Sequence, residues 1–483
     1  MVFSGLPFLF FYLVVTLLIY KLTPLKLRNL VLLIASLFFY GWGEPVYIVI
    51  MFLSIAVDYT HGMLVERWRD NDRKARMAVA SSVFFNLLIL VTFKYYDFLA
   101  GSLNAVTGWN IPLLGVPMPI GISFYTFQTM SYTIDVYRKD TPVQRNIVTF
   151  GTFVTLFPQL IAGPIIQYKS VAEQLQCRRE DLEKFVSGIQ RFCVGLAKKV
   201  LLANAVGKLW DVFLATDTAE LTVLGGWLGL MAYAFQIYFD FSGYSDMAVG
   251  LGRMLGFEFL PNFNYPYISK SITEFWRRWH ISLSSWFRDY LYIPLGGSRR
   301  GSGRKYCNIL IVFAVSGLWH GAGLTFLVWG LLNGAYQAAG GLTAGLRSRC
   351  RQALGLRDDS PVTRWWQMLV TFLLSTLAWV FFKAASLSSA LAVLRGMVSG
   401  PLLVRPILAN TGLDRGECLV ALLCLAALLA VDLLSLRRRV CERFLTLPRP
   451  LRWVLVLALL LTVAVFGVYG TGYDAQDFIY FKF

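Results

Sequence analysis

The chain has 483 residues, of which 57% are hydrophobic, and its mean hydropathy is +0.58. This is more apolar sequence than the core of one water-soluble domain buries, so a soluble globular protein is excluded. The net charge is +17, but the basic residues fall mainly in short loops between apolar runs. We interpret this charge as membrane topology beside a lipid bilayer and not as a nucleic-acid-binding surface.

Apolar runs recur from end to end, and the runs Glu417 to Leu436 and Trp453 to Tyr469 are almost continuously apolar. Such runs predict helices and not the alternating strands of an outer-membrane barrel. We expect an all-α polytopic membrane protein, with about 10–12 transmembrane helices plus re-entrant or interfacial helices around a central funnel. The expected spans are residues 5–20, 29–44, 46–64, 77–99, 119–137, 188–213, 224–250, 366–383, 417–436 and 453–470.

The basic loops predict the orientation, because positive loops face the cytoplasm. The stretches Gly41 to Pro45 and Gly101 to Pro117 lack this basic character and are expected outside, which places the N-terminus outside. The protein is therefore expected as a multi-pass protein of the bacterial inner membrane. The loops expected in the cytoplasm are residues 21–28, 66–76, 138–145, 298–305, 347–357 and 437–443.

The middle third of the chain does not consist of simple spans. Pro158 to Tyr168 is interrupted by Gly163-Pro164, and Ile272 to Pro294 mixes Arg, Trp and Asp with apolar residues. At membrane depth such sequence must be buried in protein or line a water-accessible cavity. We therefore expect the funnel or re-entrant region between about residues 150 and 335, within one membrane domain that spans residues 1–483.

Two of the three histidines lie in apolar sequence, each directly after a tryptophan: Trp279-His280 and Trp319-His320. An imidazole is the side chain best suited to moving a proton near neutral pH, and a polar side chain in a membrane is expensive without a partner or a task. Gly317, Gly321 and Gly323 surround His320 in sequence and would let helices approach and leave room for a substrate. These features favour a catalytic role for His320, against a purely structural hydrogen-bonded histidine.

His280 stands among charged residues, Arg277, Arg278 and Asp289, so an interfacial helix with aromatic anchors is an equally good interpretation. The third histidine, His61, is expected to be a solvated helix end.

Asp240 and Asp246 lie in otherwise apolar sequence. They could orient an imidazole or a substrate hydroxyl, or pair with Arg277 and Arg278 and hold the funnel together. We favour the structural role. The seven cysteines show no metal-binding spacing, and no nucleotide-binding, serine-hydrolase or zinc-protease motif occurs, so no metal is expected.

Three runs of the sequence carry a family resemblance: QIYFDFSGYSDMAVGLGRMLGF, NFNYPYISKSITEFWRRWHISLSSWFRDYLYIPLGG and SGLWHGAGLTFLVWG. Together they closely resemble the membrane-bound O-acyltransferase (MBOAT) family, and within it the alginate O-acetyltransferase membrane subunits. The specific resemblance covers about residues 120–335, the expected catalytic core, and the closing FIYFKF also resembles that group.

The resemblance implies a funnel through the membrane in which an acyl thioester from the cytoplasm meets a hydroxyl acceptor. The family's near-invariant histidine corresponds to His320, and its second histidine or asparagine position corresponds to His280. His320 is then expected to take the acceptor's proton, while His280 orients the donor or stabilises the oxyanion, with Trp279 and Trp319 as supporting side chains. The donor implied is acetyl-CoA, with no permanently bound cofactor, and the expected partners include periplasmic acetyltransferases of a polysaccharide system.

Basic residues at the inner face suit the phosphates of coenzyme A, although positive-inside topology alone would also place them there. The candidates are Arg277, Arg278, Arg299, Arg300 and Lys305.

Two other functions stay open from the sequence. One is D-alanyl or other acyl transfer to a cell-envelope polymer. The other is a proton-coupled transporter or acyl channel in which the histidines relay protons, although no inverted repeat of the kind typical of transporters is visible.

Overall fold

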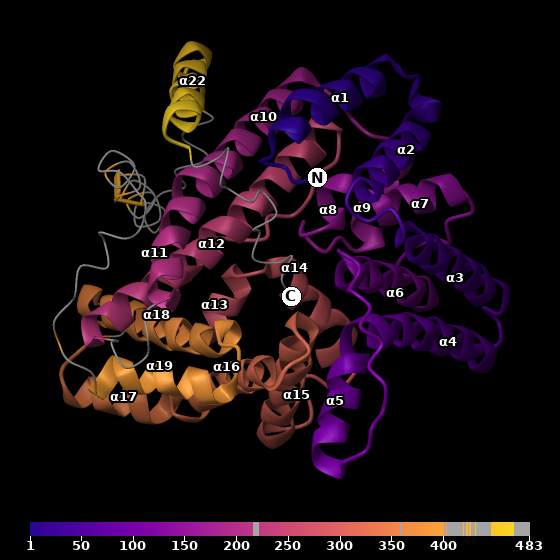
Figure 1. The fold of residues 1–483 in the computed structure, drawn as a ribbon. Coiled ribbons are helices and arrows are strands. Elements are labelled where there is room, and N and C mark those ends of the chain that lie inside the picture. The colour runs from indigo at the N-terminus through magenta and orange to yellow at the C-terminus, as the bar shows by residue number, and fades with distance from the viewer. Residues whose placement is uncertain are drawn as a thin grey trace. The chain divides into compact units, whose positions relative to one another are not determined.

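A computed structural model describes residues 1–215, 222–357, 360–399 and 446–467, together with isolated positions between 402 and 430. These residues form helices and connecting segments and contain no strand, which confirms the predicted all-α class for this part of the chain (Figure 1). They divide into two compact units. Unit 1 comprises Met1–Phe192 and Tyr244–Leu260, and unit 2 comprises Cys193–Gly243 and the described residues from Pro261 on.

Unit 1 is built from the N-terminal helices. A π-helical turn, η3 (Val91–Tyr95), joins α4 to α5 in one continuous helical stretch. Two longer helices, α10 (Leu182–Ala197) and α12 (Val223–Met254), run through both units. The other helices are η1 (Phe8–Tyr12), α1 (Leu13–Leu22), η2 (Leu25–Leu27), α2 (Arg28–Gly41), α3 (Ile48–Arg67), α4 (Asp72–Leu90), α5 (Tyr96–Thr107), α6 (Ile122–Arg138), α7 (Ile147–Thr155), α8 (Phe157–Leu160) and α9 (Tyr168–Gln176).

Helices α3, α4 and α6 pack side by side around a buried polar centre. The Asp58 carboxylate accepts hydrogen bonds from Ser82 at 2.5 Å, Asn86 at 2.8 Å and Thr133 at 3.1 Å. Each of these neutral donors comes from a neighbouring helix, so the network fixes the register of the three helices. His61 belongs to the same bundle: its ring contacts the Val57 carbonyl at 2.7 Å and the Ser81 hydroxyl at 2.8 Å, so the solvated helix end expected for it is wrong.

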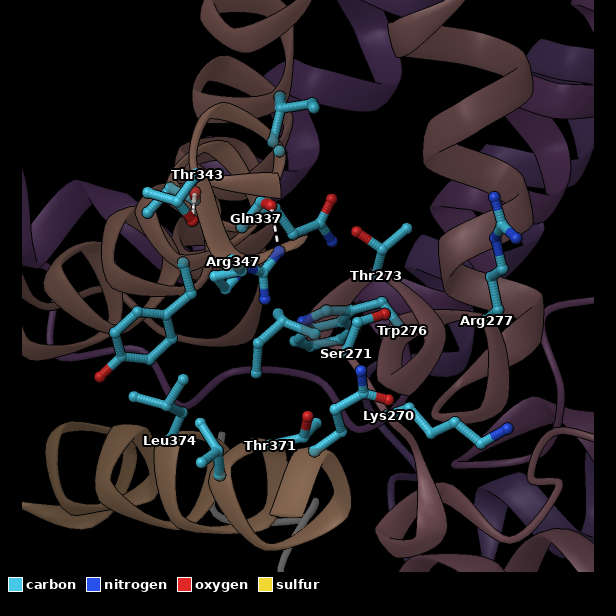
Figure 2. A pocket seen from close by; sticks show the side chains of 18 of the residues that line it. Lys270, Ser271, Thr273, Trp276, Arg277, Gln337, Thr343, Arg347, Thr371 and Leu374 are labelled. Atoms are coloured by element: carbon cyan, nitrogen blue, oxygen red, sulfur yellow. Dashed lines mark hydrogen bonds between the residues drawn. The ribbon is translucent and has the colours of Figure 1, made fainter. Parts of the chain in front are cut away.

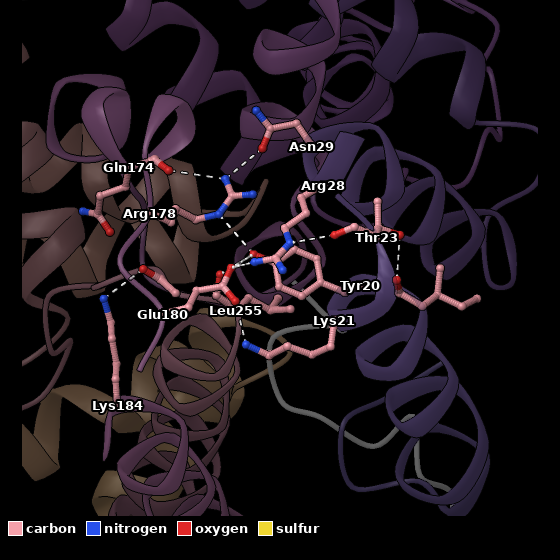
Figure 3. Close-up of polar contacts among 12 residues, drawn as sticks. Tyr20, Lys21, Thr23, Arg28, Asn29, Gln174, Arg178, Glu180, Lys184 and Leu255 are labelled. Atoms are coloured by element: carbon pink, nitrogen blue, oxygen red, sulfur yellow. Dashed lines mark hydrogen bonds and ion pairs between the residues drawn. The ribbon is translucent and has the colours of Figure 1, made fainter. Parts of the chain in front are cut away.

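A charged cluster ties the start of unit 1 to the segment before α10 (Figure 3). The Glu180 carboxylate accepts a hydrogen bond from the Tyr20 hydroxyl at 2.5 Å and pairs with Lys21 and Arg28, each at 2.6 Å. Arg178 lies over the Phe257 ring at 4.6 Å and donates to Asn29 at 2.8 Å. Burial alone would raise the pKa of Glu180, but hydrogen bonds from Lys21 and Tyr20, with the nearby positive charges, outweigh burial and lower it.

The broken segment near Gly163 has the irregular, buried structure that its sequence predicts. Helix α8 is only four residues long, and the chain from Ile161 to Gln167 has no regular secondary structure. A Cβ atom on Gly163 would lie 2.6 Å from the Pro158 carbonyl oxygen, so only glycine fits this turn.

Unit 2 contains the sequence that carries both tryptophan–histidine pairs. Helix α16 packs against both α15 and α18, and α13 contacts both α16 and α18. The elements are η4 (Lys198–Ala203), α11 (Asn204–Ala215), η6 (Pro266–Ile268), α13 (Ile272–Arg278), α14 (Ile281–Phe287), η7 (Arg288–Tyr292), α15 (Ser302–His320), α16 (Leu324–Leu342), α17 (Ala344–Ala353), α18 (Pro361–Lys383), α19 (Leu387–Ser399) and α22 (Arg449–Phe466).

Four helical stretches among the described residues are long and apolar enough to cross a bilayer: Ile48–Arg67, Asp72–Thr107, Pro361–Lys383 and Arg449–Phe466. The predicted number of crossings remains a prediction. The segment 347–357, expected as a loop, is helical over most of its length, because α17 extends to Ala353. The closing FIYFKF lies outside the described residues, and the span expected at 417–436 is described only at isolated positions.

Candidate active site

His280 lies at a sharp junction between two seven-residue helices, α13 and α14, and is fully buried. Ser271 caps α13 by accepting the Glu274 backbone N–H at 3.1 Å. At His280 the backbone adopts φ 44° and ψ 56°, the left-handed region that few non-glycine residues occupy. Such strained positions concentrate at functional sites, which favours a functional role over an interfacial anchor.

Asn262, which the sequence analysis did not single out, holds His280 in place. Its side-chain oxygen lies 3.2 Å from His280 Nδ1 and accepts hydrogen bonds from the Ser282 backbone N–H at 3.0 Å and hydroxyl at 2.9 Å. Its backbone carbonyl accepts the Ile281 N–H at 2.9 Å. The segment before α13 is therefore bound to the turn that carries the imidazole.

The environment of His280 favours a neutral ring. The residue lies outside the helices long enough to span a bilayer, and burial lowers the pKa of its imidazole to about 3. The Phe241 ring packs against it with centroids 4.7 Å apart and nearly perpendicular planes. An uncharged imidazole is the form that this apolar contact accommodates.

His320 is the last residue of α15 and is buried among aromatic rings. Its ring lies 5.1 Å from the Trp329 ring and 5.2 Å from the Phe382 ring, and both contacts are steeply inclined. The helix ends here because Gly321 takes an extended conformation. A nitrogen base is thus buried among aromatic rings at the point where the helix stops.

The fold brings the two histidines together. Their ring centroids lie 6.5 Å apart, and the Trp319 ring lies 6.2 Å from His280 and 4.9 Å from His320. At this separation a small reacting group placed between the two imidazoles could contact both. Trp319 is buried and lies beside both rings, and its supporting role stays a prediction.

Close helix packing positions His320. A Cβ atom on Gly317 would collide with the Phe326 carbonyl oxygen, and one on Gly330 would collide with that of Phe313, so α15 and α16 approach at glycines as the sequence predicts. The expectation that Gly321 leaves room for a substrate is wrong, because the Phe326 ring occupies that place.

A layer of tryptophans surrounds the histidine pair. Trp279 is buried, stacks on Phe275 with centroids 5.4 Å apart, and lies 5.1 Å from Trp379. Trp379 stacks on Trp329 at 5.6 Å. Trp329, which contacts His320, connects this layer of rings to the histidine pair.

A cavity of about 1250 Å³ opens beside this layer (Figure 2). One wall is Trp276, whose ring lies 5.7 Å from Trp329, the ring that contacts His320. The cavity also reaches Ser316, one helical turn before His320 in α15. Six basic side chains and no acidic side chain belong to the described lining: Lys270, Arg277, Arg288, Lys305, Arg347 and Arg351.

Only some of the basic residues proposed from the sequence as coenzyme A ligands line this cavity. Arg277 and Lys305 line it, whereas Arg278, Arg299 and Arg300 do not. Arg278 instead pairs with Glu274 at 2.8 Å and donates to the Asn264 carbonyl at 3.1 Å. The other four lining cations were missed, because basic residues distant in sequence are gathered only by the fold.

The acidic candidates have basic partners that the sequence analysis did not identify. Asp240 forms a buried ion pair with Lys199 at 2.5 Å, and Asp246, in unit 1, pairs with Arg191 at 2.9 Å. These are not the partners expected, Arg277 and Arg278. Asp289 pairs with its neighbour Arg288 at 2.8 Å. A paired buried carboxylate fits the orienting or structural role that we favour.

The chain has helices long and apolar enough to cross a bilayer, which is typical of an integral membrane protein. Its two buried imidazoles form a candidate reaction site. The model of the membrane-bound O-acyltransferase family matches residues 44–382. The chain belongs to this family, and it is a membrane protein and an O-acyltransferase.

Curated relatives cover most of the chain. It is 43% identical over 404 residues to the probable alginate O-acetylase AlgI of Pseudomonas aeruginosa, covering 83% of this chain and 75% of that protein. It is 34% identical over 394 residues to a peptidoglycan O-acetyltransferase of Helicobacter pylori, covering 76% of this chain and 73% of the relative. A teichoic acid D-alanyltransferase of Bacillus subtilis is 28% identical over 246 residues, which cover 46% of this chain and 61% of that protein.

Proposed function

We propose that this O-acyltransferase transfers an acetyl group from acetyl-CoA, at the cytoplasmic side of the bacterial inner membrane, toward a hydroxyl acceptor that modifies an extracellular polysaccharide such as alginate. The observation that carries the proposal is the pair of buried imidazoles, with centroids 6.5 Å apart, beside a cavity lined by cations. The similarity to alginate O-acetylases supports a polysaccharide as the final acceptor.

In the proposed reaction His320 is the general base. The acceptor hydroxyl oxygen attacks the thioester carbonyl carbon while His320 takes the hydroxyl proton. When the resulting tetrahedral intermediate collapses, the carbon–sulfur bond breaks and the proton passes from His320 to the departing sulfur. The products are an acetyl ester and the free thiol of coenzyme A, so atoms and charge balance without an acyl-enzyme.

The cavity suits the donor because of its charge and its aromatic lining. Six cations line the described cavity, and although Arg288 also pairs with Asp289, this concentration of positive charge favours the phosphates of coenzyme A. Trp276, Tyr306 and Trp366 offer aromatic faces to the adenine ring. A donor bound here would direct its thioester along Ser316 toward His320.

The acceptor and the partners belong to the same proposal. The polysaccharide is modified through periplasmic acetyltransferase partners, and the N-terminus faces outward. The rival within the enzyme class is D-alanyl transfer, which the name of the Bacillus subtilis relative suggests. The O-acetylases match a larger part of this chain at higher identity, which favours acetyl transfer.

The proposal is tested by incubating the purified protein in detergent with radiolabelled acetyl-CoA, with and without periplasmic partner proteins. The expected result is labelled partner or polysaccharide together with free coenzyme A thiol. Label carried from D-alanyl-loaded carrier protein, with acetyl-CoA inert, would replace acetyl transfer with the rival.

A further inference from the structure

The contacts of Asn262 determine which way its amide group faces. The Ser282 backbone N–H, 3.0 Å away, is a donor only, so the atom it meets must be the amide oxygen and not the amide nitrogen. The Ser282 hydroxyl, at 2.9 Å from the same atom, is consistent with this assignment. Asn262 is itself buried, so water does not compete for the oxygen.

This orientation in turn determines where the proton of His280 lies. Nδ1 of His280 is 3.2 Å from the same amide oxygen, and two acceptors facing each other would repel, so Nδ1 carries a hydrogen and donates it. In a neutral imidazole the other nitrogen, Nε2, then carries the lone pair. The left-handed backbone at His280 and the Ile281-to-Asn262 backbone hydrogen bond fix the ring against this acceptor.

We propose that Asn262 is a positioning residue that holds His280 in the Nδ1–H tautomer, so that Nε2 accepts a hydrogen bond from an N–H or O–H group of the substrate. The inference rests on the proposed acetyl transfer and gives the two histidines different tasks. His320 moves the proton, while His280 binds a substrate hydrogen. A neutral His280 in this tautomer has no hydrogen on Nε2 and does not stabilise an oxyanion there.

The described rings that pack on His280 come from α12 and α15. Phe241 packs on the ring from α12, and Trp319 and His320 face it from α15. Asp240, which precedes Phe241, is paired with Lys199. Among these described neighbours His320 is titratable, so its charge enters any interpretation of the pH dependence of His280.

The chain offers a direct measurement, because it contains only three histidines. Nitrogen-15 labelling of histidine gives three imidazole spectra, and His280→Gln identifies the one that disappears. We expect a protonated-type Nδ1 and a non-protonated-type Nε2 for His280, and in Asn262→Leu the loss of this preference. A proton on Nε2 in the wild type, or an unchanged spectrum in Asn262→Leu, would overturn the inference whether or not the protein transfers acetyl groups.

Activity supplies a second readout. Asn262→Leu is expected to lower turnover roughly 10- to 1000-fold, as for other residues that orient a histidine. Asn262→Asp keeps an acceptor for Nδ1 and restores most activity at high pH. Its carboxylate raises the pKa of His280, so activity falls at a higher pH on the acid side than in the wild type.

Ser282→Ala is the matched control, since it removes one hydrogen bond to Asn262 but leaves the contact with His280. An Asn262→Asp profile with the wild-type acid limb, or a Ser282→Ala loss equal to that of Asn262→Leu, would reduce Asn262 to a structural residue. A wild type without acetyl transfer but with the expected spectrum would contradict the proposed function and not this inference.

Discussion

The imidazole rings of His280 and His320 lie with their centroids 6.5 Å apart inside a layer of aromatic side chains. One ring is supplied by a strained turn between two short helices, and the other by the last residue of α15. They meet because glycines let α15 and α16 approach and because Asn262 binds the turn. Each element of this arrangement predicts a measurable effect.

Substitutions at His280 distinguish a functional ring from an anchor. His280→Ala should lower turnover roughly 10- to 1000-fold, a loss comparable to that of other single contacts with the reacting groups, because the acceptor for the substrate hydrogen is removed. His280→Asn should retain more activity, because the amide keeps an acceptor oxygen and asparagine tolerates the left-handed backbone better than alanine. Steady-state rates at matched protein levels test this. Two fully active variants would make His280 an interfacial anchor.

Removing cations from the cavity should weaken donor binding without a matching loss in kcat. Lys305→Gln and Arg347→Gln, singly, should raise the KM for acetyl-CoA by roughly tenfold, because a hydrogen bond to a charged group contributes about 1.5 kcal/mol or more. Arg299→Gln and Arg300→Gln are matched controls with exposed side chains outside the cavity lining. Equal effects in both pairs would indicate general surface charge and not a donor site.

The Glu180 cluster should make unit 1 sensitive to acid. The pKa of Glu180 is lower in the folded protein than the ordinary carboxyl value of 4.5. The stabilisation from ionised Glu180 is therefore complete above pH 4.5. It is lost as the pH falls below that value and through the lower pKa of the folded protein. Glu180→Gln should lower the free energy of unfolding by about 1–3 kcal/mol at pH 7 and flatten this acid dependence.

Thermal unfolding in detergent between neutral and acid pH measures both effects. Glu258→Gln is the control, because Glu258 also pairs with a lysine, Lys184 at 3.2 Å, but is 72% exposed and should contribute little. If the unfolding temperatures of wild type and Glu180→Gln changed in parallel with pH, Glu180 would not be the source of the acid sensitivity.

Topology can be read from single cysteines introduced after the seven native ones are replaced. Asp70→Cys, in the basic loop before α4, should react with an impermeant reagent only after the membrane is opened, and Val106→Cys should react in intact cells. Both positions are exposed, whereas Asn71 caps α4 and Asn104 is hydrogen-bonded to Ile111. The opposite pattern would place the cavity cations on the wrong side for a cytoplasmic donor.

The sequence predicted the all-α class and singled out His280 and His320 as candidate site residues. Both predictions rest on local signals, namely apolar runs and polar side chains within them that cost free energy at membrane depth. The sequence also predicted the close approach of α15 to a neighbouring helix at Gly317. Asn262 was missed, since an asparagine in a turn-rich segment is ordinary until the fold places it against His280. Lys270, Arg288, Arg347 and Arg351 were missed as cavity residues for the same reason. The partners of Asp240 and Asp246 were wrong, because long-range pairing between helices leaves no periodic signal.

The central claim is that His320 removes the acceptor proton during acetyl transfer from a thioester. The most direct test compares wild type, His320→Gln and His61→Gln, purified in detergent, for transfer of label from radiolabelled acetyl-CoA to the acceptor. His61 is a control because it binds Ser81 within the α3–α4 pair of unit 1. We expect His320→Gln to lose transfer while keeping expression and helical content, since glutamine cannot take a proton at neutral pH, and His61→Gln to retain it. Near-wild-type transfer by His320→Gln would contradict the account.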